Sequence, residues 1–175
     1  MKATGIVRRI DELGRVVIPK EIRRTMRIRE GDPLEIYTDK NDGIIFKKYS
    51  PVGELSVIAD DVTQSLSKVS RMTAVICDRD IVTACSGPHK KDFEGKALSE
   101  AFRQSLESDV RKLRATGITP PVDNTALTVC GISPIISEGE CMGAIMLISD
   151  EKTGDERESL MLDAAAELLS RQAQF

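Results

Sequence analysis

The stretch "VRRIDELGRVVIPKEIRR", residues 7–24, contains five arginines and one lysine around the β-branched run "VVI". This basic character contrasts with the whole chain of 175 residues, whose formal net charge is −3. Residues 1–53 carry 12 basic and 8 acidic residues, a net charge of +4, whereas residues 54–175 carry 13 and 20, a net charge of −7. Such asymmetry predicts an anionic partner for the N-terminal part only.

The residues around this stretch predict short strands and one short helix. "DELG" suits a turn, because Asp and Gly favour turn conformations, and Pro19 fits the first position of a helix over residues 20–26. Four strands are predicted, over residues 4–10, 15–19, 33–39 and 44–49. About 50 residues of this kind bury little apolar surface, so we expect the N-terminal domain to be completed by a second copy.

A boundary is predicted at "SPVG", residues 50–53, and it is followed by a helix over residues 54–70. Apolar residues recur along this helix at spacings of three and four: Leu55, Ile58, Val62, Leu66 and Val69. Two interpretations are open. The helix either lies on the sheet of its own domain or continues a dimer axis between the domains. The predicted domains are residues 1–50, a linker helix 51–70 and a C-terminal domain 71–175.

The C-terminal domain alternates helices with pairs of strands. The predicted hairpins join residues 73–78 to 81–86 and residues 125–137 to 141–149, and the predicted helices cover residues 95–115 and 153–172. The first helix carries an apolar stripe of Leu98, Phe102, Leu106, Val110 and Leu113. The second begins at a cap-like Thr153 or Asp155 and has Met161, Ala164, Ala165, Leu168 and Leu169 on one side. This order predicts an α+β domain, an antiparallel sheet with helices packed on it.

The residues favour neither an enzyme nor a metal site. Cys77, Cys85, Cys130 and Cys141 have no Cys-x-x-Cys spacing and lie in apolar runs, so we expect reduced, buried thiols without catalytic reactivity. His89 is the only histidine, which disfavours zinc sites and histidine-based triads. No cofactor and no metal are predicted. No signal peptide or membrane helix is visible in the sequence, so a cytoplasmic protein is expected.

The stretch "TGIVRRIDELGRVVIPKEIRRTMRIREGDPLEIY" closely resembles the N-terminal DNA-binding domain of AbrB-type transition-state regulators. The resemblance implies a swapped-hairpin β-barrel formed by two intertwined chains, which bind double-stranded DNA through its shape and flexibility, with a loose, AT-rich consensus. The residues that this resemblance and the local charge assign to DNA binding are Arg8, Arg9, Arg15, Lys20, Arg23 and Arg24. Arginine suits this role because its guanidinium group pairs with phosphate oxygens and guanine edges.

"TALTVCGISPIISEGECMGAIMLIS" followed by "TGDERESLMLDAAAELL" resembles a GAF domain, a sensory α+β module. An AbrB-like head on a GAF-like body is similar to a type of sporulation regulator from spore-forming bacteria. This implies a homotetramer held by the GAF-like domains and their flanking helices. A candidate ligand pocket is predicted at Ser86, His89, Lys90, Lys91 and Phe93, for an unidentified small molecule.

The leading hypothesis is therefore a transcriptional regulator that activates some sporulation genes and represses others. A metabolite sensor or interaction scaffold, for which DNA binding is secondary, is the alternative. A methionine sulfoxide reductase that uses cysteines, as in some GAF-like proteins, is disfavoured because these thiols lie in apolar runs.

Overall fold

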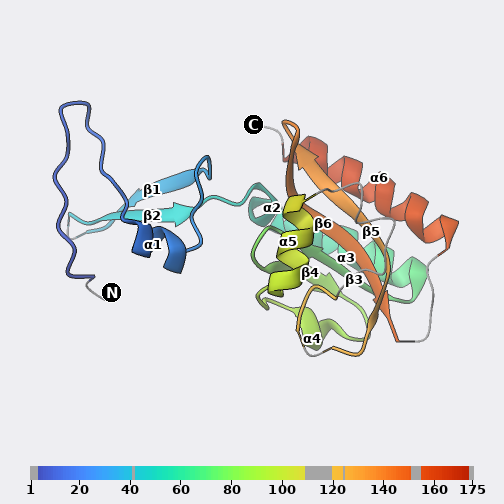
Figure 1. The fold of residues 1–175 in the computed structure, drawn as a ribbon. Coiled ribbons are helices and arrows are strands. Elements are labelled where there is room, and N and C mark those ends of the chain that lie inside the picture. Colours follow the sequence, from blue (N-terminus) through green and yellow to red (C-terminus); the bar gives the residue numbers. More distant parts are fainter. Residues whose placement is uncertain (1–3, 41, 109–119, 124, 151–154, 174–175) are drawn as a thin grey trace. The chain divides into compact units, whose positions relative to one another are not determined.

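The computed structural model describes residues 4–40, 42–108, 120–123, 125–150 and 155–173, which form two compact units (Figure 1). Unit 1 ends at Tyr49 and unit 2 begins at Ser50. Among the described residues, no helix is both long enough and apolar enough to cross a lipid bilayer.

Unit 1 contains the predicted short helix and one β-hairpin. Helix α1 spans Lys20–Thr25 and follows Pro19. Strands β1 (Leu34–Thr38) and β2 (Ile44–Lys48) pair antiparallel, with Ile36 opposite Phe46. The loop between them is closed by Asp39, whose N–H donates to the Gly43 carbonyl at 2.9 Å and whose Oδ1 accepts from the Gly43 N–H at 2.7 Å. This hairpin and this helix are as predicted.

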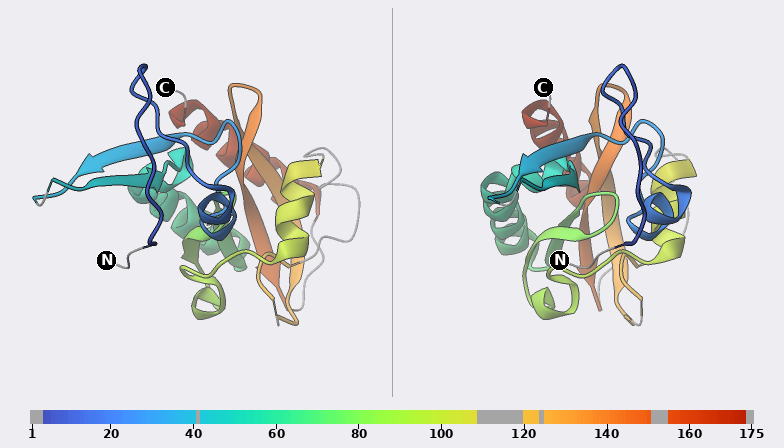
Figure 2. Two further views of the ribbon diagram at one scale, coloured as in Figure 1. Left: turned by 60° about the vertical axis from the view of Figure 1, so that its left-hand side comes forward. Right: turned by 90° about the vertical axis from the view of Figure 1, so that its left-hand side faces the viewer.

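The prediction of strands at residues 4–10 and 15–19 is wrong for the single chain. Both segments lie outside the strands and form the two arms of a long loop, drawn in dark blue in Figures 1 and 2. A β-branched run becomes a strand only when a neighbouring strand takes up its backbone hydrogen bonds. The described part of one chain supplies no such strand for these arms, and it contains no closed barrel.

Unit 2 is built on a four-stranded antiparallel sheet in the order β4-β3-β6-β5. The predicted hairpins are present as β3 (Thr73–Cys77) with β4 (Val82–Ser86) and β5 (Thr128–Ser137) with β6 (Glu140–Ser149). They join through β3 and β6, where Val75 pairs with Met146. The α+β fold class is thereby confirmed for this unit.

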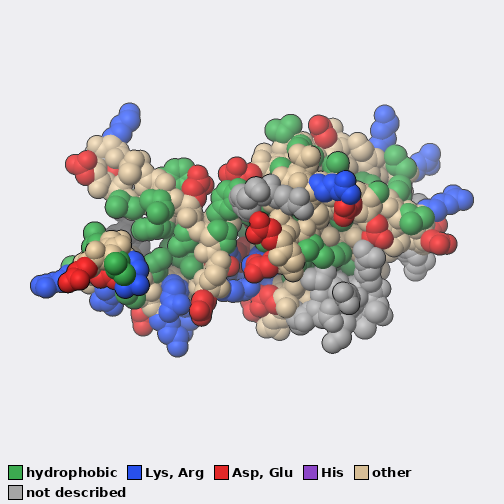
Figure 3. All heavy atoms as spheres, turned by 90° about the horizontal axis from the view of Figure 1, so that it is seen from above, with side chains coloured by type: hydrophobic (Ala, Val, Ile, Leu, Met, Phe, Trp, Pro, Cys, Tyr) green, Lys and Arg blue, Asp and Glu red, His purple; other side chains and the backbone are tan. Residues whose placement is uncertain are grey.

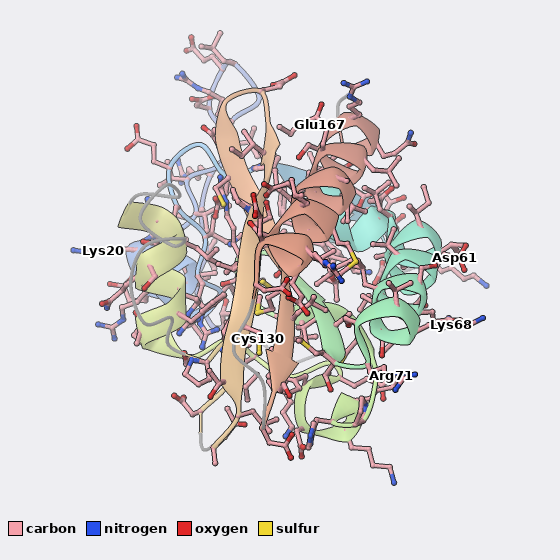
Figure 4. The ribbon with its side chains drawn as sticks, turned by 90° about the vertical axis from the view of Figure 1, so that its right-hand side faces the viewer. Lys20, Asp61, Lys68, Arg71, Cys130 and Glu167 are labelled. Carbon is pink, nitrogen blue, oxygen red and sulfur yellow. The ribbon has the colours of Figure 1, made fainter. Side chains whose placement is uncertain are left out.

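Helices cover both faces of this sheet (Figure 4). Helices α3 (Ser56–Ser70) and α6 (Glu156–Gln172) pack on one face, and α5 (Glu100–Ser108) lies on the other face with the short α4 (Lys90–Phe93). A further short helix, α2 (Pro51–Glu54), precedes α3.

The sheet has a hydrophobic core on each face, because its strands carry apolar side chains toward both faces. Along β6, Ile145 and Leu147 pack beneath α3 and α6, whereas Met146 and Ile148 pack toward α5. All four side chains are fully buried. A strand buried on both faces has a continuous apolar run, which explains "AIMLI" in the sequence.

Two details of the predicted helices are wrong. The helix predicted from residue 95 begins at Glu100, because Ala97 forms a β-bridge with Ile81 and the Ser99 hydroxyl accepts the N–H of Phe102 at 3.2 Å as a cap. Its predicted continuation over residues 109–115, with Val110 and Leu113, lies outside the described residues, as does Thr153.

The face predicted for α6 is right only in part. Leu169 is buried and Met161 and Ala165 pack against the core as predicted, whereas Ala164 and Leu168 are exposed. Leu162 and Ala166, which were not predicted, are buried instead. Alanine and leucine occur on both sides of this helix, so periodicity alone cannot select the face that packs. Its start is the predicted Asp155, which forms a capping box with Glu158.

Helix α3 lies on the sheet of its own unit, which was the first of the two interpretations of this helix. It buries Ala59, Thr63 and Leu66, while Val57 and Val69 are exposed.

Candidate nucleic-acid interface

Arg8, Arg9 and Arg15 lie on the long loop of unit 1, and all three are exposed. Arg8 and Arg9 are on its first arm and Arg15 is at the start of its second arm. The Arg8 guanidinium donates to a neighbouring backbone group, the Val7 carbonyl, at 3.2 Å. The charged ends of these arginines are therefore accessible to an anionic ligand.

The tip of this loop, residues 11–15, is held by one carboxylate. Asp11 Oδ1 accepts from the backbone N–H groups of Leu13 at 3.0 Å and of Arg15 at 2.9 Å. Asp11 Oδ2 accepts from Arg15 Nε at 2.8 Å. Gly14 has a φ of +78°, a conformation that favours glycine at this turn. Sequence analysis missed Asp11, although an acidic residue four positions before an arginine across a turn is a usable signal.

Helix α1 presents the other three predicted cations. Lys20, Arg23 and Arg24 are exposed, and Lys20 projects away from the ribbon in Figure 4. Arg23 and Arg24 lie in the last turn of α1, where the carbonyl end of a helix favours positive charge. Six exposed cations thus come from the loop and from the helix that directly follows it in the chain.

Unit 1 also exposes an unusual number of large apolar side chains. They come from the long loop, from the end of α1 and from the hairpin: Ile6, Val7, Ile10, Leu13, Val16, Val17, Met26, Ile36, Tyr37 and Ile44. Figure 3 shows hydrophobic side chains at the surface alongside those of Lys and Arg. Val7 is 84% exposed and Leu13 is 74% exposed. A contiguous set of this kind marks a surface that another protein chain covers.

Of the five residues of the predicted ligand pocket, Ser86 and Phe93 lie toward opposite faces of the sheet. Ser86 Oγ lies 3.2 Å from Thr63 Oγ1 of α3, whereas Phe93 is fully buried in the core on the opposite face of the sheet. The His89 imidazole lies 3.6 Å from Asp92 Oδ2 and 3.9 Å from an oxygen of Asp150. Lys90 and Lys91 are exposed, and Lys90 Nζ is paired with Glu94 at 3.0 Å. Ligand binding there stays a prediction.

Two surface hollows of unit 2 lie elsewhere. One, of about 350 Å³, runs between α3 and α6 and is mainly apolar, with the lining residues Ile58, Asp61, Val62, Ser65, Leu66, Ala165 and Leu168. In Figure 4 Asp61 projects from α3 at the edge of this face. The other, of about 530 Å³, lies between β5 and α6, where Ser133 Oγ donates to Asp163 Oδ1 at 2.7 Å. Three of the five residues of the seam predicted for residues 55–69, namely Ile58, Val62 and Leu66, thus line a groove between two helices.

All four cysteines are free thiols. Cys77 and Cys85 are buried, whereas Cys130 and Cys141 are half-buried. Burial raises the pKa of Cys85 to about 12, and it also raises the pKa of Cys77 and of Cys141. Such thiols are poor nucleophiles at neutral pH.

Comparison with known proteins assigns both parts of the chain. Residues 7–54 match the family described as antidote-toxin recognition MazE, bacterial antitoxin. Residues 54–174 match the family described as stage V sporulation protein T C-terminal, transcription factor. These matches define a two-part protein of the transcription-factor class. The chain belongs to the stage V sporulation protein T family.

Two relatives from Bacillus subtilis agree with this assignment. The chain is 44% identical over 180 residues to stage V sporulation protein T of Bacillus subtilis (strain 168), a match that covers 98% of each protein. It is 67% identical over 51 residues to the transition state regulatory protein AbrB of the same organism, a match that covers 29% of this chain and 52% of AbrB. Among solved structures, it is similar to the cofactor-binding GAF domain of the nutrient sensor CodY from Clostridium difficile, with 12% identity and a TM-score of 0.49 over 63% of this chain and 81% of that chain.

Proposed function

We propose that this protein is a DNA-binding regulator of transcription during sporulation, and that Arg8, Arg9, Arg15, Lys20, Arg23 and Arg24 of unit 1 contact the DNA. The observation that carries this proposal is the set of six exposed cations in a segment that matches AbrB at 67% identity. Exposed guanidinium groups without buried partners are free to exchange water for phosphate oxygens.

The binding form is a dimer of unit 1. Each chain carries two arms with β-branched residues, a backbone that lies outside any strand, and exposed apolar side chains. If the arms of two chains exchange and pair, the backbone groups gain partners and the apolar side chains are buried. The product is the swapped-hairpin barrel that the resemblance implies. It brings two sets of cations together, doubling the positive charge that faces the DNA.

Binding rests mainly on phosphate contacts and on DNA shape. Phosphate contacts carry no base information, so sequence preference arises from how easily a site bends or narrows its minor groove. AT-rich sites with a loose consensus fit this mode. A regulator of this kind activates or represses according to where it sits relative to a promoter. It acts in the cytoplasm of a spore-forming bacterium, where the chromosome lies.

Unit 2 joins two such dimers into a tetramer. The groove between α3 and α6 exposes an apolar lining, and Val57 and Val69 add further exposed apolar surface on α3. A second copy that packs its own α3 and α6 against this face would bury both sets of side chains. Linking two DNA-binding dimers raises the effective concentration of the second head at a neighbouring site.

The test is DNA binding by the full chain, measured by fluorescence anisotropy with an AT-rich duplex over a series of salt concentrations. Arg15→Ala and Arg23→Ala should each weaken binding by about tenfold or more, and each should reduce the slope of log affinity against log salt by about two, because the dimer loses one phosphate contact from each chain. Arg171→Ala is the matched control, since it removes the same charge from an exposed arginine in unit 2 and should leave affinity unchanged.

Unchanged affinity in both unit 1 variants would contradict the assignment of these residues. If the wild-type chain itself bound no duplex at low salt, the alternative of a sensor or scaffold would be favoured. Parallel measurement of thermal unfolding excludes loss of fold as the cause of weak binding.

A further inference from the structure

We propose that Asp11 is a positioning residue: its carboxylate holds the Arg15 guanidinium in the orientation that contacts DNA. This inference rests on the proposed function, because it concerns how one of the six cations is presented. The observation behind it is that one acidic side chain is hydrogen-bonded at the tip of a loop whose arginines would otherwise attract an anion.

The geometry ties Arg15 to Asp11 at both its backbone and its side chain. The backbone N–H of Asp11 donates to the Arg15 carbonyl at 3.1 Å, and the backbone N–H of Arg15 donates to Asp11 Oδ1 at 2.9 Å. Asp11 Oδ2 then accepts the Nε–H of Arg15 at 2.8 Å. The same residue thus closes the turn and fixes the direction in which the arginine side chain leaves it.

The hydrogen bond at Nε leaves the two terminal amino groups of the guanidinium available to a ligand. Arginine presents a rigid fork of donors, and its two terminal amino groups are those that pair with two oxygens of one phosphate. The Arg15 side chain is 71% exposed although it is held by Asp11. An arginine anchored through Nε and open at its far end is oriented without being blocked.

Stability does not explain the pair. Exposed ion pairs contribute little to folding, and the Asp11 side chain is 42% exposed. Hydrogen bonds from the Arg15 backbone and side chain hold the pKa of Asp11 below its ordinary value, so the carboxylate stays charged at neutral pH. On charge alone, this carboxylate should weaken DNA binding by repelling phosphate. Its benefit is that it restricts the rotamers of Arg15 before DNA binds. This restriction should raise the affinity for DNA roughly two- to tenfold.

Removal of the Asp11 charge should strengthen DNA binding, whereas release of Arg15 should weaken it. The direction of the change in affinity in one variant therefore shows which effect is larger. In Asp11→Asn the side-chain oxygen still accepts the N–H groups of Leu13 and Arg15, so the turn is kept. The amide nitrogen cannot accept the Nε–H of Arg15, and the arginine is released. We expect full-length Asp11→Asn to bind the AT-rich duplex roughly two- to tenfold more weakly, with an unchanged melting temperature.

Glu12→Gln is the matched control, since Glu12 is an exposed carboxylate at the same tip and its substitution changes the charge equally. It should bind DNA as tightly as the wild type or more tightly. If Asp11→Asn also bound as tightly or more tightly, the positioning role would be wrong and Asp11 would act only through its charge.

A double-mutant cycle shows whether Asp11 acts through Arg15. In the Arg15→Ala background, Asp11→Asn should no longer weaken binding. An equal weakening in both backgrounds would assign the effect to the loop and overturn the inference. Loss of binding in Arg15→Ala with none in Asp11→Asn overturns this inference alone, whereas no loss in Arg15→Ala overturns the DNA-binding role of Arg15 as well.

Discussion

Ser50 Oγ donates a hydrogen bond to Asp78 Oδ2 over 2.9 Å. Ser50 is the first residue of unit 2 and caps α2, where its hydroxyl also accepts the N–H of Gly53 at 3.1 Å. Asp78 lies in the turn between β3 and β4, and its Oδ1 accepts the N–H groups of Asp80 at 2.7 Å and of Ile81 at 2.8 Å. One carboxylate therefore closes a hairpin and anchors the residue at which unit 1 is attached.

Substitution of Asp78 should reveal both roles. Asp78→Ala leaves two backbone donors and one hydroxyl without their acceptor, and we expect a loss of about 1–3 kcal/mol in the free energy of unfolding of the full chain. Asp78→Asn keeps an oxygen for the two backbone N–H groups and should lose much less. Urea denaturation of both variants is the measurement, and equal stability of Asp78→Ala and wild type would contradict the anchoring role.

Gly143 on β6 marks a close approach between two strands. A Cβ atom at Gly143 would lie 2.0 Å from the carbonyl oxygen of Cys77, a backbone atom of β3. Because neither strand can move without breaking its pairing, Gly143→Ala should destabilise the protein by about 3 kcal/mol or more.

Gly131 on β5 is the control for this effect. Its added Cβ would lie 2.8 Å from Cδ1 of Leu162, the end of a flexible side chain. Gly131→Ala should therefore cost about 1 kcal/mol. Thermal or urea unfolding of the two variants checks the order, and a larger loss for Gly131→Ala would show that the β3–β6 contact is more adaptable than its geometry indicates.

Local sequence patterns predicted both hairpins of unit 2 and the start of α6, because these depend on turn residues and on the capping box of Asp155 and Glu158. They could not predict that β3 pairs with β6, since that contact joins segments about 70 residues apart in the chain. The face of α6 was predicted only in part for a related reason, because only the sheet beneath the helix selects Leu162 over Leu168.

At the candidate site, composition and resemblance identified the cations but not their geometry. The strands predicted for the arms find no pairing strand among the described residues of the single chain, which leaves them as loop. The role of Asp11 was missed because a carboxylate among arginines indicates only charge compensation in a sequence, whereas its three hydrogen bonds to Leu13 and Arg15 become visible only in the folded turn.

The four thiols should differ in reactivity. Cys77 and Cys85 are buried and burial raises their pKa, that of Cys85 to about 12, so both should resist a mild alkylating agent at pH 8 in the native protein. Cys130 is half-buried and should be labelled first, and Cys141, which is half-buried but whose pKa burial also raises, should follow it. Mass spectrometry after timed labelling gives the order, with denatured protein as the control in which all four react. Rapid native labelling of Cys77 or Cys85 would favour thiol chemistry in this protein.

Asp155 should make part of the stability depend on pH. Hydrogen bonding with Glu158, and then with the backbone N–H groups of Glu158 and Arg157, lowers the pKa of Asp155 below its ordinary value of 3.8. A lowered pKa in the folded state means that the contribution is present above about pH 4 and is lost as the pH falls through the folded value. Asp155→Ala should therefore melt below the wild type at pH 7, with the difference shrinking in acid.

Asp155→Asn serves as the control for this cap, because its side chain keeps an acceptor for the helix N–H groups but does not titrate. Its melting temperature should stay near that of the wild type at pH 7. A difference between Asp155→Ala and wild type that is constant from pH 7 to pH 3 would show that the carboxylate charge is not what stabilises α6.

The groove between α3 and α6 gives the sharpest test of the tetramer. Leu168 lines this groove and is 47% exposed, whereas Leu160 on the same helix is 64% exposed and does not line it. Leu168→Glu places a charge in the proposed interface, where it would lose its water without gaining a partner, so we expect the full chain to fall from tetramer to dimer. Leu160→Glu adds the same charge to the same helix and should leave the tetramer intact. Light scattering gives the mass of each variant. A tetrameric Leu168→Glu would place the interface elsewhere, and a dimeric wild type would contradict the tetramer itself.

If the dimer forms as expected, its affinity for one short duplex should match that of the wild type, while its affinity for DNA with two neighbouring sites should be lower, because the second head is no longer tethered.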